Sequence, residues 1–277
     1  MTTLQQHIIE TLGAKPTINP AEEIRTRVDF LKEFLLTAKR KGFVLGISGG
    51  QDSTLAGKLC QIAVDELNTL DNGTDYVFLP VLLPYKTQKD AADAVLAVEF
   101  ITDGRTEGLN LNIAEPVDGA VNAYNAVSPV EISDYSKGNI KARIRMTMQY
   151  ALAGEMGLLV VGSDQNAELI GGYYTLFGDG GCDVTPLSRL DKRQGKALLV
   201  ELNAPAIFYT KKPTADLLDN AIGQPDEVEL GITYENIDDY LEGETVPPEV
   251  AKNIETRYLA TEHKRQLPTT PFDTWWK

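Results

Sequence analysis

The sequence predicts an α/β protein with a doubly wound, mostly parallel sheet that has helices on both faces. Three observations support this prediction. Short apolar runs of strand length alternate, between residues 19 and 161, with longer segments whose apolar residues recur at helical spacing. The first apolar run leads into a glycine-rich turn and then into a helix. The last run is short and wholly apolar, which is typical of a strand covered on both faces.

The predicted elements follow from capping residues and apolar periodicity. Asn19 and Pro20 mark the start of a long helix, because asparagine caps a helix and proline suits its first turn. The first strand is expected at 43–47, and a helix is expected at 54–68 after the glycine turn. The remaining prediction is a strand at 76–83, a helix at 89–101, a weaker strand at 105–111, helices at 116–127 and 133–156, and a strand at 158–161.

The turn after the first strand is the most informative segment and reads Ser48-Gly49-Gly50-Gln51-Asp52-Ser53. Its glycines let backbone N–H groups point inward, its serines add hydroxyl donors, and the helix N-terminus adds partial positive charge, so the turn suits a phosphate group. Neither Gly-x-x-x-x-Gly-Lys-Ser/Thr nor Gly-x-Gly-x-x-Gly occurs in the sequence, which excludes two common phosphate-binding patterns. The alternative is an ordinary glycine turn in which Asp52 and Ser53 cap the helix.

The position of Asp52 indicates a metal-bound polyphosphate, because a carboxylate in a phosphate cradle repels the ligand unless Mg²⁺ lies between them. The turn resembles the pyrophosphate loop of the ATP pyrophosphatases, which cleave ATP between its α- and β-phosphates and transfer AMP to an oxygen. A second polar segment, Gly162 to Glu168, follows the strand at 158–161. Since ligands bind at the carboxyl ends of parallel strands, we expect both segments to face each other across one cleft.

Length and composition favour a single domain over residues 1–277. The chain is 43% hydrophobic, which is enough for a substantial core, and no linker, internal repeat or low-complexity tract divides it. We expect a cytoplasmic protein with no membrane partner, because the sequence shows neither a signal pattern nor an apolar run of spanning length. Two cysteines and two histidines are too few for a disulfide framework or a zinc site of the usual ligand count.

The charge balance argues against nucleic acid as a partner. The net charge is −14, from 26 basic and 40 acidic residues, whereas nucleic-acid binding normally needs a basic surface. An acidic protein that binds anions must gather its positive charge locally, although each cluster alone is also compatible with a solvated helix face. Four clusters occur: Lys137, Lys141, Arg143 and Arg145; Lys192, Arg193 and Lys196; Lys211 and Lys212; and His263, Lys264 and Arg265.

Motifs over nearly the whole chain resemble those of the ammonia-dependent NAD synthetases. The phosphate turn alone is typical of a superfamily, whereas the later motifs are specific. In family order they are Lys141-Ala142-Arg143, Gly162-Ser163-Asp164 with Glu168, Gly178-Asp179-Gly180-Gly181, Lys192-Arg193-Gln194-Gly195, Pro213-Thr214-Ala215-Asp216-Leu217, Asp238-Asp239-Tyr240-Leu241-Glu242-Gly243 and Thr261-Glu262-His263-Lys264-Arg265.

The resemblance implies an adenine nucleotide alpha hydrolase-like fold with a three-layer, Rossmann-like architecture. It also implies a ligase that amidates deamido-NAD⁺ (nicotinic acid adenine dinucleotide) with ammonia. ATP would first adenylate the carboxylate, and the products would be NAD⁺, AMP and diphosphate, which is the last step of NAD⁺ biosynthesis. The implied partners are these small molecules and a second copy of the chain, with deamido-NAD⁺ at the interface of a homodimer.

The resemblance also implies roles for individual residues. Those expected to bind ATP are Gly46, Ile47, Ser48, Gly49, Gly50, Gln51, Asp52, Ser53, Ser163, Lys192 and Thr214. Those expected to hold Mg²⁺ are Asp52 and Glu168, and those expected to contact deamido-NAD⁺ are Arg143, Asp183, His263 and Lys264. Asp52 would act in catalysis through its metal.

Ammonium must lose a proton before it can attack an acyl carbon, so a nearby carboxylate is needed as a base. Asp179 and Asp183 flank the glycines of the segment 171–183, and we favour Asp179 as the base and Asp183 as a substrate contact. This segment is glycine-rich and aromatic, which fits a substrate loop or a tight turn carrying core aromatics. Leu176 stands where the family commonly has lysine, and we expect Arg143 and Lys264 to retain the affinity for deamido-NAD⁺.

Free ammonia is the expected nitrogen donor, because glutamine-using versions need an additional amidase domain and the sheet starts near Phe43. The aromatic segment from Pro271 to Trp276 is expected to dock on its own domain or on a second subunit. Two rival functions stay open at this point. One is an enzyme that adenylates tRNA or another acid, and the other is a non-catalytic sensor of ATP or NAD⁺.

Overall fold

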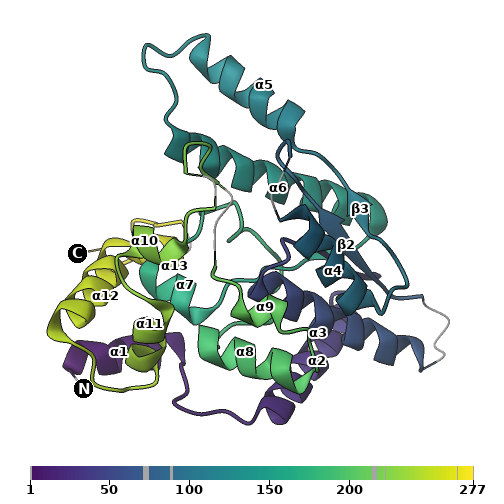
Figure 1. Ribbon diagram of the computed structural model, residues 1–277, viewed down its shortest axis with the longest axis horizontal. Coiled ribbons are helices and arrows are strands. Elements are labelled where there is room, and N and C mark those ends of the chain that lie inside the picture. Colours follow the sequence, from purple (N-terminus) through teal and green to yellow (C-terminus); the bar gives the residue numbers. More distant parts are fainter. Residues whose placement is uncertain are drawn as a thin grey trace.

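The computed structural model describes residues 2–70, 75–87, 90–213, 217–221, 223–266 and 268–276. Within these residues four parallel strands form one sheet in the order β3-β2-β1-β4 (Figure 1). The strands are β1 (Gly42–Gly46), β2 (Val77–Leu82), β3 (Leu109–Asn110) and β4 (Leu159–Val160). The predicted α/β class with a parallel sheet is confirmed.

The sheet is doubly wound because its strands are added on both sides of β1. β2 and β3 follow on one side, and β4 then pairs with the other side, where Phe43 lies opposite Leu159. Alternate residues of β1 point to opposite faces. Phe43 and Leu45 therefore belong to the core on one face, whereas Val44 belongs to the core on the other.

Helices cover both faces of the sheet (Figure 1). The helices that contribute to the core containing Phe43 are α2 (Pro20–Thr37), α3 (Gln51–Asn68), α4 (Ala91–Thr102) and α8 (Lys192–Glu201). Those that contribute to the core containing Val44 are α5 (Ala114–Asn125) and α6 (Asp134–Met156). The short helix α9 (Ile207–Thr210) packs against α3.

A second group of helices brings the two ends of the chain together. Helix α1 near the N-terminus lies beside the C-terminal helices, and Ile8 shares a core with Ile237 and Tyr258 (Figure 1). The helices of this group are α1 (Thr3–Leu12), α7 (Asn166–Gly171), α10 (Asp226–Leu230), α11 (Tyr234–Leu241), α12 (Pro248–Ala260) and α13 (Glu262–Arg265). None of the helices in the described ranges is long and apolar enough to cross a lipid bilayer.

The predicted elements are present with shifted boundaries. Asn19 caps α2 as expected, its side chain accepting hydrogen bonds from the N–H groups of Ala21 and Glu22. The helix predicted at 54–68 begins earlier, at Gln51, because Gly50 is its N-cap. The strand predicted at 105–111 is limited to Leu109–Asn110, since the chain turns at Gly108 with a φ of +72°.

Candidate active site

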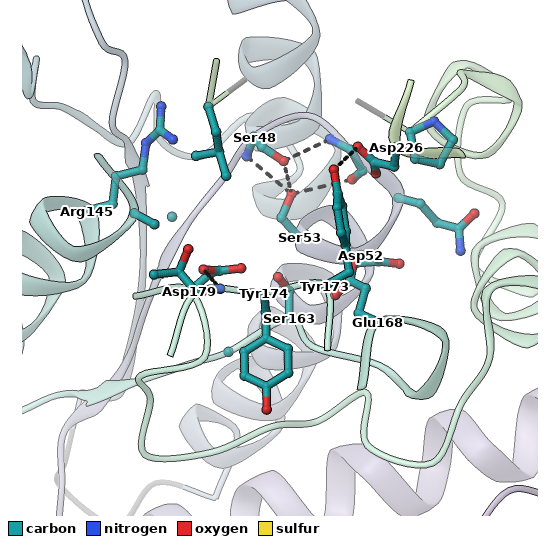
Figure 2. Close-up of a pocket in the computed structure, with 18 of the residues that line it drawn as sticks. Ser48, Asp52, Ser53, Arg145, Ser163, Glu168, Tyr173, Tyr174, Asp179 and Asp226 are labelled. Atoms are coloured by element: carbon teal, nitrogen blue, oxygen red, sulfur yellow. Dashed lines mark hydrogen bonds between the residues drawn. The ribbon is translucent and has the colours of Figure 1, made fainter. Parts of the chain in front are cut away.

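A cavity of about 390 Å³ opens at the carboxyl ends of β1 and β4, where the order of the strands reverses. Ser48 and Asp52 line it from the turn after β1, and Ser163 and Glu168 line it from the segment after β4 (Figure 2). The prediction that these two polar segments face one cleft is confirmed. Loop residues around 172–179 and 211–213 complete the wall.

The turn after β1 has the geometry of an anion cradle. Gly49 has a φ of +80°, and a Cβ there would lie 2.6 Å from the backbone of Asp93 and Ala94. The Ser48 N–H donates to Ser53 Oγ at 3.2 Å, and the two serine hydroxyl oxygens lie 3.0 Å apart. Gly50 caps α3 without a side-chain hydrogen bond, and Ser48, Gly50 and Ser53 line the cavity at the positive end of the helix.

The alternative of Asp52 and Ser53 as helix caps does not hold. Both residues lie within the first turn of α3, and Ser53 Oγ accepts from Ser48 instead. Asp52 Oδ2 pairs with Lys192 Nζ at 2.6 Å, and each of the two side chains is only 12% exposed. The Lys192 ammonium also lies 4.9 Å from the ring centre of Tyr234. A carboxylate and an ammonium from distant helices thus meet on the cavity wall.

Several carboxylates lie on this wall or close to it, and the negative charge of each disfavours ionisation of the others. Burial, and then the charge of Asp52, raise the pKa of Glu168 well above its usual value. Burial, followed by the charges of Asp179 and Asp52, raises the pKa of Asp164 to about 7. Such repulsion is relieved by a cation between the carboxylates. Figure 2 shows Asp52 and Glu168 on the same side of the cavity.

Asp52 and Glu168 fit the donor set of Mg²⁺, which prefers oxygen ligands and completes its coordination with water and substrate phosphates. In the described part of the chain, no group of three or more His, Cys, Asp or Glu side chains is arranged to hold a metal. A metal at this place would therefore be bound by two carboxylates together with a phosphate.

The glycine-rich segment is a tight turn at the mouth of the cavity. The Asp179 carboxylate accepts from the Thr175 N–H at 2.9 Å and lies across the cavity from Asp52 (Figure 2). Asp179 is exposed to the cavity, yet protein surrounds its carboxyl group, and this desolvation raises its pKa. Tyr173 and Tyr174 line the cavity. The segment is thus both a turn and part of the site.

Four of the predicted site residues do not line the cavity. Gly49 is turned toward α4, and His263 is exposed. Arg143 donates to the carbonyl of Leu176, with both distances 3.3 Å. Asp183 accepts from the Tyr150 hydroxyl at 3.1 Å and from the backbone N–H of Val160 at 2.8 Å, so it holds the end of β4.

The other predicted residues line the cavity, apart from Thr214, which lies outside the described residues. Those that line it are Gly46, Ile47, Ser48, Gly50, Gln51, Asp52, Ser53, Ser163, Glu168, Asp179, Lys192 and Lys264. The Lys264 ammonium donates to the carbonyls of Gly172 and Tyr174 at 2.8 and 2.7 Å. Desolvation, with a smaller effect from Arg143, lowers the pKa of Lys264.

Each of the four basic clusters supplies at least one residue to the cavity, which supports the inference that they serve anion binding. The residues supplied are Arg145, Lys192, Lys211, Lys212 and Lys264. Most of the other members pair with carboxylates. Lys137 and Lys141 bind Asp219 at 2.7 and 2.5 Å, and Arg193 binds Asp239 at 2.7 Å.

Sequence reasoning missed several acidic residues of the cavity, among them Asp226 and Glu229. The Tyr173 hydroxyl donates to both, at 3.4 and 3.2 Å, and the Tyr234 hydroxyl donates to Asp226 at 3.3 Å (Figure 2). No pattern in the sequence distinguishes these carboxylates from the many others of an acidic chain. Their position depends on the packing of α10 beside the turn at 171–173.

A family model and individual known proteins are similar to this chain. The model of a family described as NAD synthase matches residues 23–268. The NH₃-dependent NAD⁺ synthetase of Bacillus cereus (strain 03BB102) is 54% identical over 275 residues, which are 99% of this chain and 100% of that protein.

Two solved structures share the fold over nearly their whole length. The NAD⁺ synthetase of Burkholderia pseudomallei has a TM-score of 0.79 and 38% identity, with 95% of this chain and 96% of that chain covered. An NMN synthetase of Francisella tularensis has a TM-score of 0.80 and 31% identity, with 93% of this chain and 100% of that chain covered. The fold is therefore shared by proteins that bear two different synthetase names.

Proposed function

This chain belongs to the NAD synthase family, and from that premise we propose that it is an ammonia-dependent NAD⁺ synthetase. As a ligase it amidates the nicotinate carboxylate of deamido-NAD⁺ with ammonia. ATP is converted to AMP and diphosphate in the same reaction, which is the last step of NAD⁺ biosynthesis. The full-length similarity to proteins of this name and the cavity between the two polar segments support the proposal.

One observation of the structure carries the proposal. Ser48, Gly50 and Ser53 of the phosphate turn line, at the positive end of α3, a cavity that also contains the Asp52–Lys192 pair. A triphosphate bound on the turn would place its charged oxygens beside the Lys192 ammonium. A cradle for phosphate with a fixed cation beside it suits phosphoryl or nucleotidyl transfer better than binding alone.

The reaction needs two steps, because a carboxylate repels nucleophiles and oxide is a poor leaving group. The carboxylate oxygen of the substrate first attacks the α-phosphorus of ATP, and the bond to diphosphate breaks. Negative charge then grows on the leaving diphosphate, where Lys192 and the N–H groups of the turn stabilise it. Ammonia next attacks the acyl carbon, and AMP leaves with the electron pair of the C–O bond.

Asp179 is our proposed base for the second step. It lines the cavity, and its raised pKa makes it a better proton acceptor than an ordinary carboxylate. Its negative charge also attracts ammonium from solution. Asp183 is a less suitable base, because one of its oxygens is already bound to the N–H of Val160 and the other to Tyr150.

We also propose that Mg²⁺ binds with ATP. Asp52 and Glu168 would hold it, and it would supply positive charge to the diphosphate as this group leaves. Burial, and then the charge of Asp52, raise the pKa of Glu168, and a cation beside both carboxylates would offset this cost, which supports the assignment.

A homodimer is the proposed assembly. Arg143 and Asp183, two of the expected substrate contacts, lie outside the cavity, and Asp183 accepts a hydrogen bond from the half-exposed Tyr150 of α6. The exposed large apolar side chains of α5, of α6 and of the segment between them, here called the α5–α6 surface, are Tyr124, Val127, Val130, Tyr135, Tyr150 and Met156. A second copy packed there would cover the apolar residues and enclose the outlying substrate contacts. A cytoplasmic location stays a prediction from the sequence.

The deciding experiment incubates the protein with ATP, Mg²⁺, ammonium and deamido-NAD⁺, and then omits each component in turn. We expect AMP, diphosphate and NAD⁺ in equal amounts only in the complete mixture. Diphosphate without deamido-NAD⁺ would favour another acceptor, and its absence in every mixture would favour a nucleotide sensor. Because an NMN synthetase shares the fold, nicotinic acid mononucleotide is the informative competing acceptor, and we expect a lower kcat/KM for it.

A further inference from the structure

We propose that Asp238 is a positioning residue for the reaction, because it fixes the start of α8 and thereby the place of the Lys192 ammonium. Asp238 belongs to α11, which packs in the core shared by the N- and C-terminal helices, and it does not line the cavity. The inference rests on the proposed role of Lys192 in binding ATP.

The contacts of Asp238 are directed at backbone groups that a helix cannot satisfy by itself. The first N–H groups of an α-helix have no partner within the helix. At the start of α8 the Lys192 N–H donates to Asp238 Oδ1 at 3.1 Å, and the Arg193 N–H donates to Oδ2 at 2.9 Å. Asp191 accepts from the next N–H, that of Gln194, at 2.7 Å. Asp238 is only 3% exposed, so water competes little for these bonds.

The other polar groups of Lys192 are held as well. Its carbonyl accepts from Gln51 Nε2 at 2.8 Å, and its ammonium binds Asp52 at 2.6 Å. Gln51 and Asp52 are the first two residues of α3, directly after the phosphate turn. Lys192 is therefore fixed from one side by α3 and from the other by Asp238, with the ring of Tyr234, also on α11, beside its ammonium.

Gly195 is part of the same arrangement. A Cβ at this position would lie 2.9 Å from Gln51 Nε2, so a larger residue would push the Gln51 side chain away from the Lys192 carbonyl. The close approach of α3 and α8 thus depends on the absence of a side chain one turn into α8.

Fixing the backbone matters because lysine has a long and flexible side chain. Its ammonium acts at one point only when the Cα is fixed as well, and electrostatic stabilisation of a transition state falls when a charge is misplaced. If the start of α8 shifts, the ammonium moves relative to the phosphate turn. Asp238 thus links the helices around α11 to the nucleotide site without touching a substrate.

The test is a double-mutant cycle on nucleotide binding. Titration calorimetry at about pH 9, where Asp238 is ionised and both of its oxygens accept, measures the Kd of α,β-methylene ATP with Mg²⁺ for the wild type, Asp238→Asn, Lys192→Met and the double variant. We expect Asp238→Asn to raise Kd about 10-fold, because asparagine offers one acceptor oxygen where aspartate offers two. In the Lys192→Met background the same change is expected to have no further effect, since Asp238 acts through Lys192.

Asp239→Asn is the matched control, because it makes the same chemical change at the next residue of the same helix. Its carboxylate pairs with the Arg193 side chain where the two are 37% and 43% exposed, and exposed pairs contribute little. We expect the wild-type Kd for this variant. Thermal unfolding checks that each variant folds, and Asp238→Ser, which keeps one oxygen, replaces Asp238→Asn in the cycle if the latter does not fold.

Two results would overturn the positioning role: an unchanged Kd for Asp238→Asn, or an equal rise of Kd in both backgrounds. The second would mean that Asp238 acts on the site by a route other than Lys192. A wild-type Kd for Lys192→Met would instead remove the assignment of Lys192 to ATP on which the inference rests. The failure of the assignment and the failure of the positioning role are thus distinguishable.

Discussion

At the scale of single residues, Asp52 interacts with two other ionisable groups of the cavity, Lys192 and Glu168. Its carboxylate binds the Lys192 ammonium, and its charge contributes to the raised pKa of Glu168. Neutralising Asp52 would remove the partner of Lys192 and weaken the repulsion that favours a cation beside Glu168. The residue therefore affects both the fixed positive charge of the site and its proposed metal.

We predict that Asp52→Asn lowers the rate of adenylation about 100-fold and shifts the Mg²⁺ dependence to higher concentration. Diphosphate release in a single turnover measures the rate. Asp65→Asn is the control, because it lies on the same helix but pairs with Arg105 at the surface, 2.6 Å away. A wild-type rate with unchanged Mg²⁺ dependence would remove Asp52 from the metal site.

Asp179→Asn is expected to slow only the step that uses ammonia. The carboxylate takes a proton from ammonium, so the loss should be largest near neutral pH and should shrink at higher pH, where free ammonia is abundant. Rapid quenching of a preformed adenylate with ammonium, at about pH 7 and about pH 9, measures this step. Normal rates at both values would show that the base lies elsewhere.

At the scale of elements, the turn between β1 and α3 depends on one backbone conformation. Gly49 adopts a φ of +80° and lies directly against the backbone at the start of α4. A side chain there would strain the turn and push α3 and α4 apart. The start of α3 with Ser53, and Ser48 before it, would then shift relative to the cavity.

Gly49→Ala is therefore expected to lower the free energy of unfolding by more than about 1 kcal/mol and to raise the KM for ATP. Gly119→Ala is the matched control, because Gly119 lies in α5 and no atom would contact its Cβ within 4 Å. That change should stabilise the protein slightly, since alanine favours helix. Urea denaturation measures both effects, and equal stabilities of the two variants would contradict the prediction.

At the scale of the whole molecule, buried carboxylates make stability depend on pH. Burial, with a smaller effect of Asp191, raises the pKa of Asp238 to about 8, and burial raises the pKa of Asp191 to about 6. The folded protein thus binds more protons than the unfolded chain between the ordinary value of 3.8 and these values. Stability must then fall as pH rises through this window.

We predict a lower free energy of unfolding at about pH 8.5 than at about pH 6, and a smaller difference for Asp238→Asn. Urea denaturation at the two pH values measures the difference. Surface carboxylates whose pKa is lowered by basic partners, such as Glu66 beside Arg25, act in the opposite direction but only in more acidic solution. Greater stability at the higher pH would contradict the prediction.

The proposed homodimer predicts an effect of charges on the α5–α6 surface. Val127 and Val130 are 85% and 67% exposed, and replacing both with glutamate should dissociate the dimer and lower activity. Val95→Glu, at an exposed position on α4, is the control that should change neither. Sedimentation velocity measures the assembly. A monomeric wild type, or a double variant that stays dimeric, would contradict the proposal.

The sequence predicts that the aromatic segment from Pro271 to Trp276 packs on its own domain or on a second subunit. Phe272 is 92% exposed, so this ring of the segment does not pack on its own domain, which is one of the two expected places. Docking on a second subunit is the alternative that stays a prediction. The packing partner of such a ring depends on tertiary or subunit contacts. A run of aromatic residues in the sequence does not identify that partner.

The sequence by itself determined the features that depend on near neighbours along the chain. The Asn19 cap, the alternation of Phe43, Val44 and Leu45, and the glycine turn each follow from a few consecutive residues. The turn also indicated where the cavity would be, because the carboxyl ends of parallel strands meet at one edge of the sheet. These patterns are local, so they are visible before folding.

Only the tertiary structure decided which distant groups meet. Lys192 and Asp52 are 140 residues apart along the chain, and Lys192 and Asp238 are 46 residues apart. No local pattern encodes these distances, because they arise from the packing of α3, α8 and α11 against one another. Likewise, Asp226 at the start of α10 lines the cavity, whereas Arg143 on α6 lies outside it. Chemistry that depends on such pairs requires the folded chain.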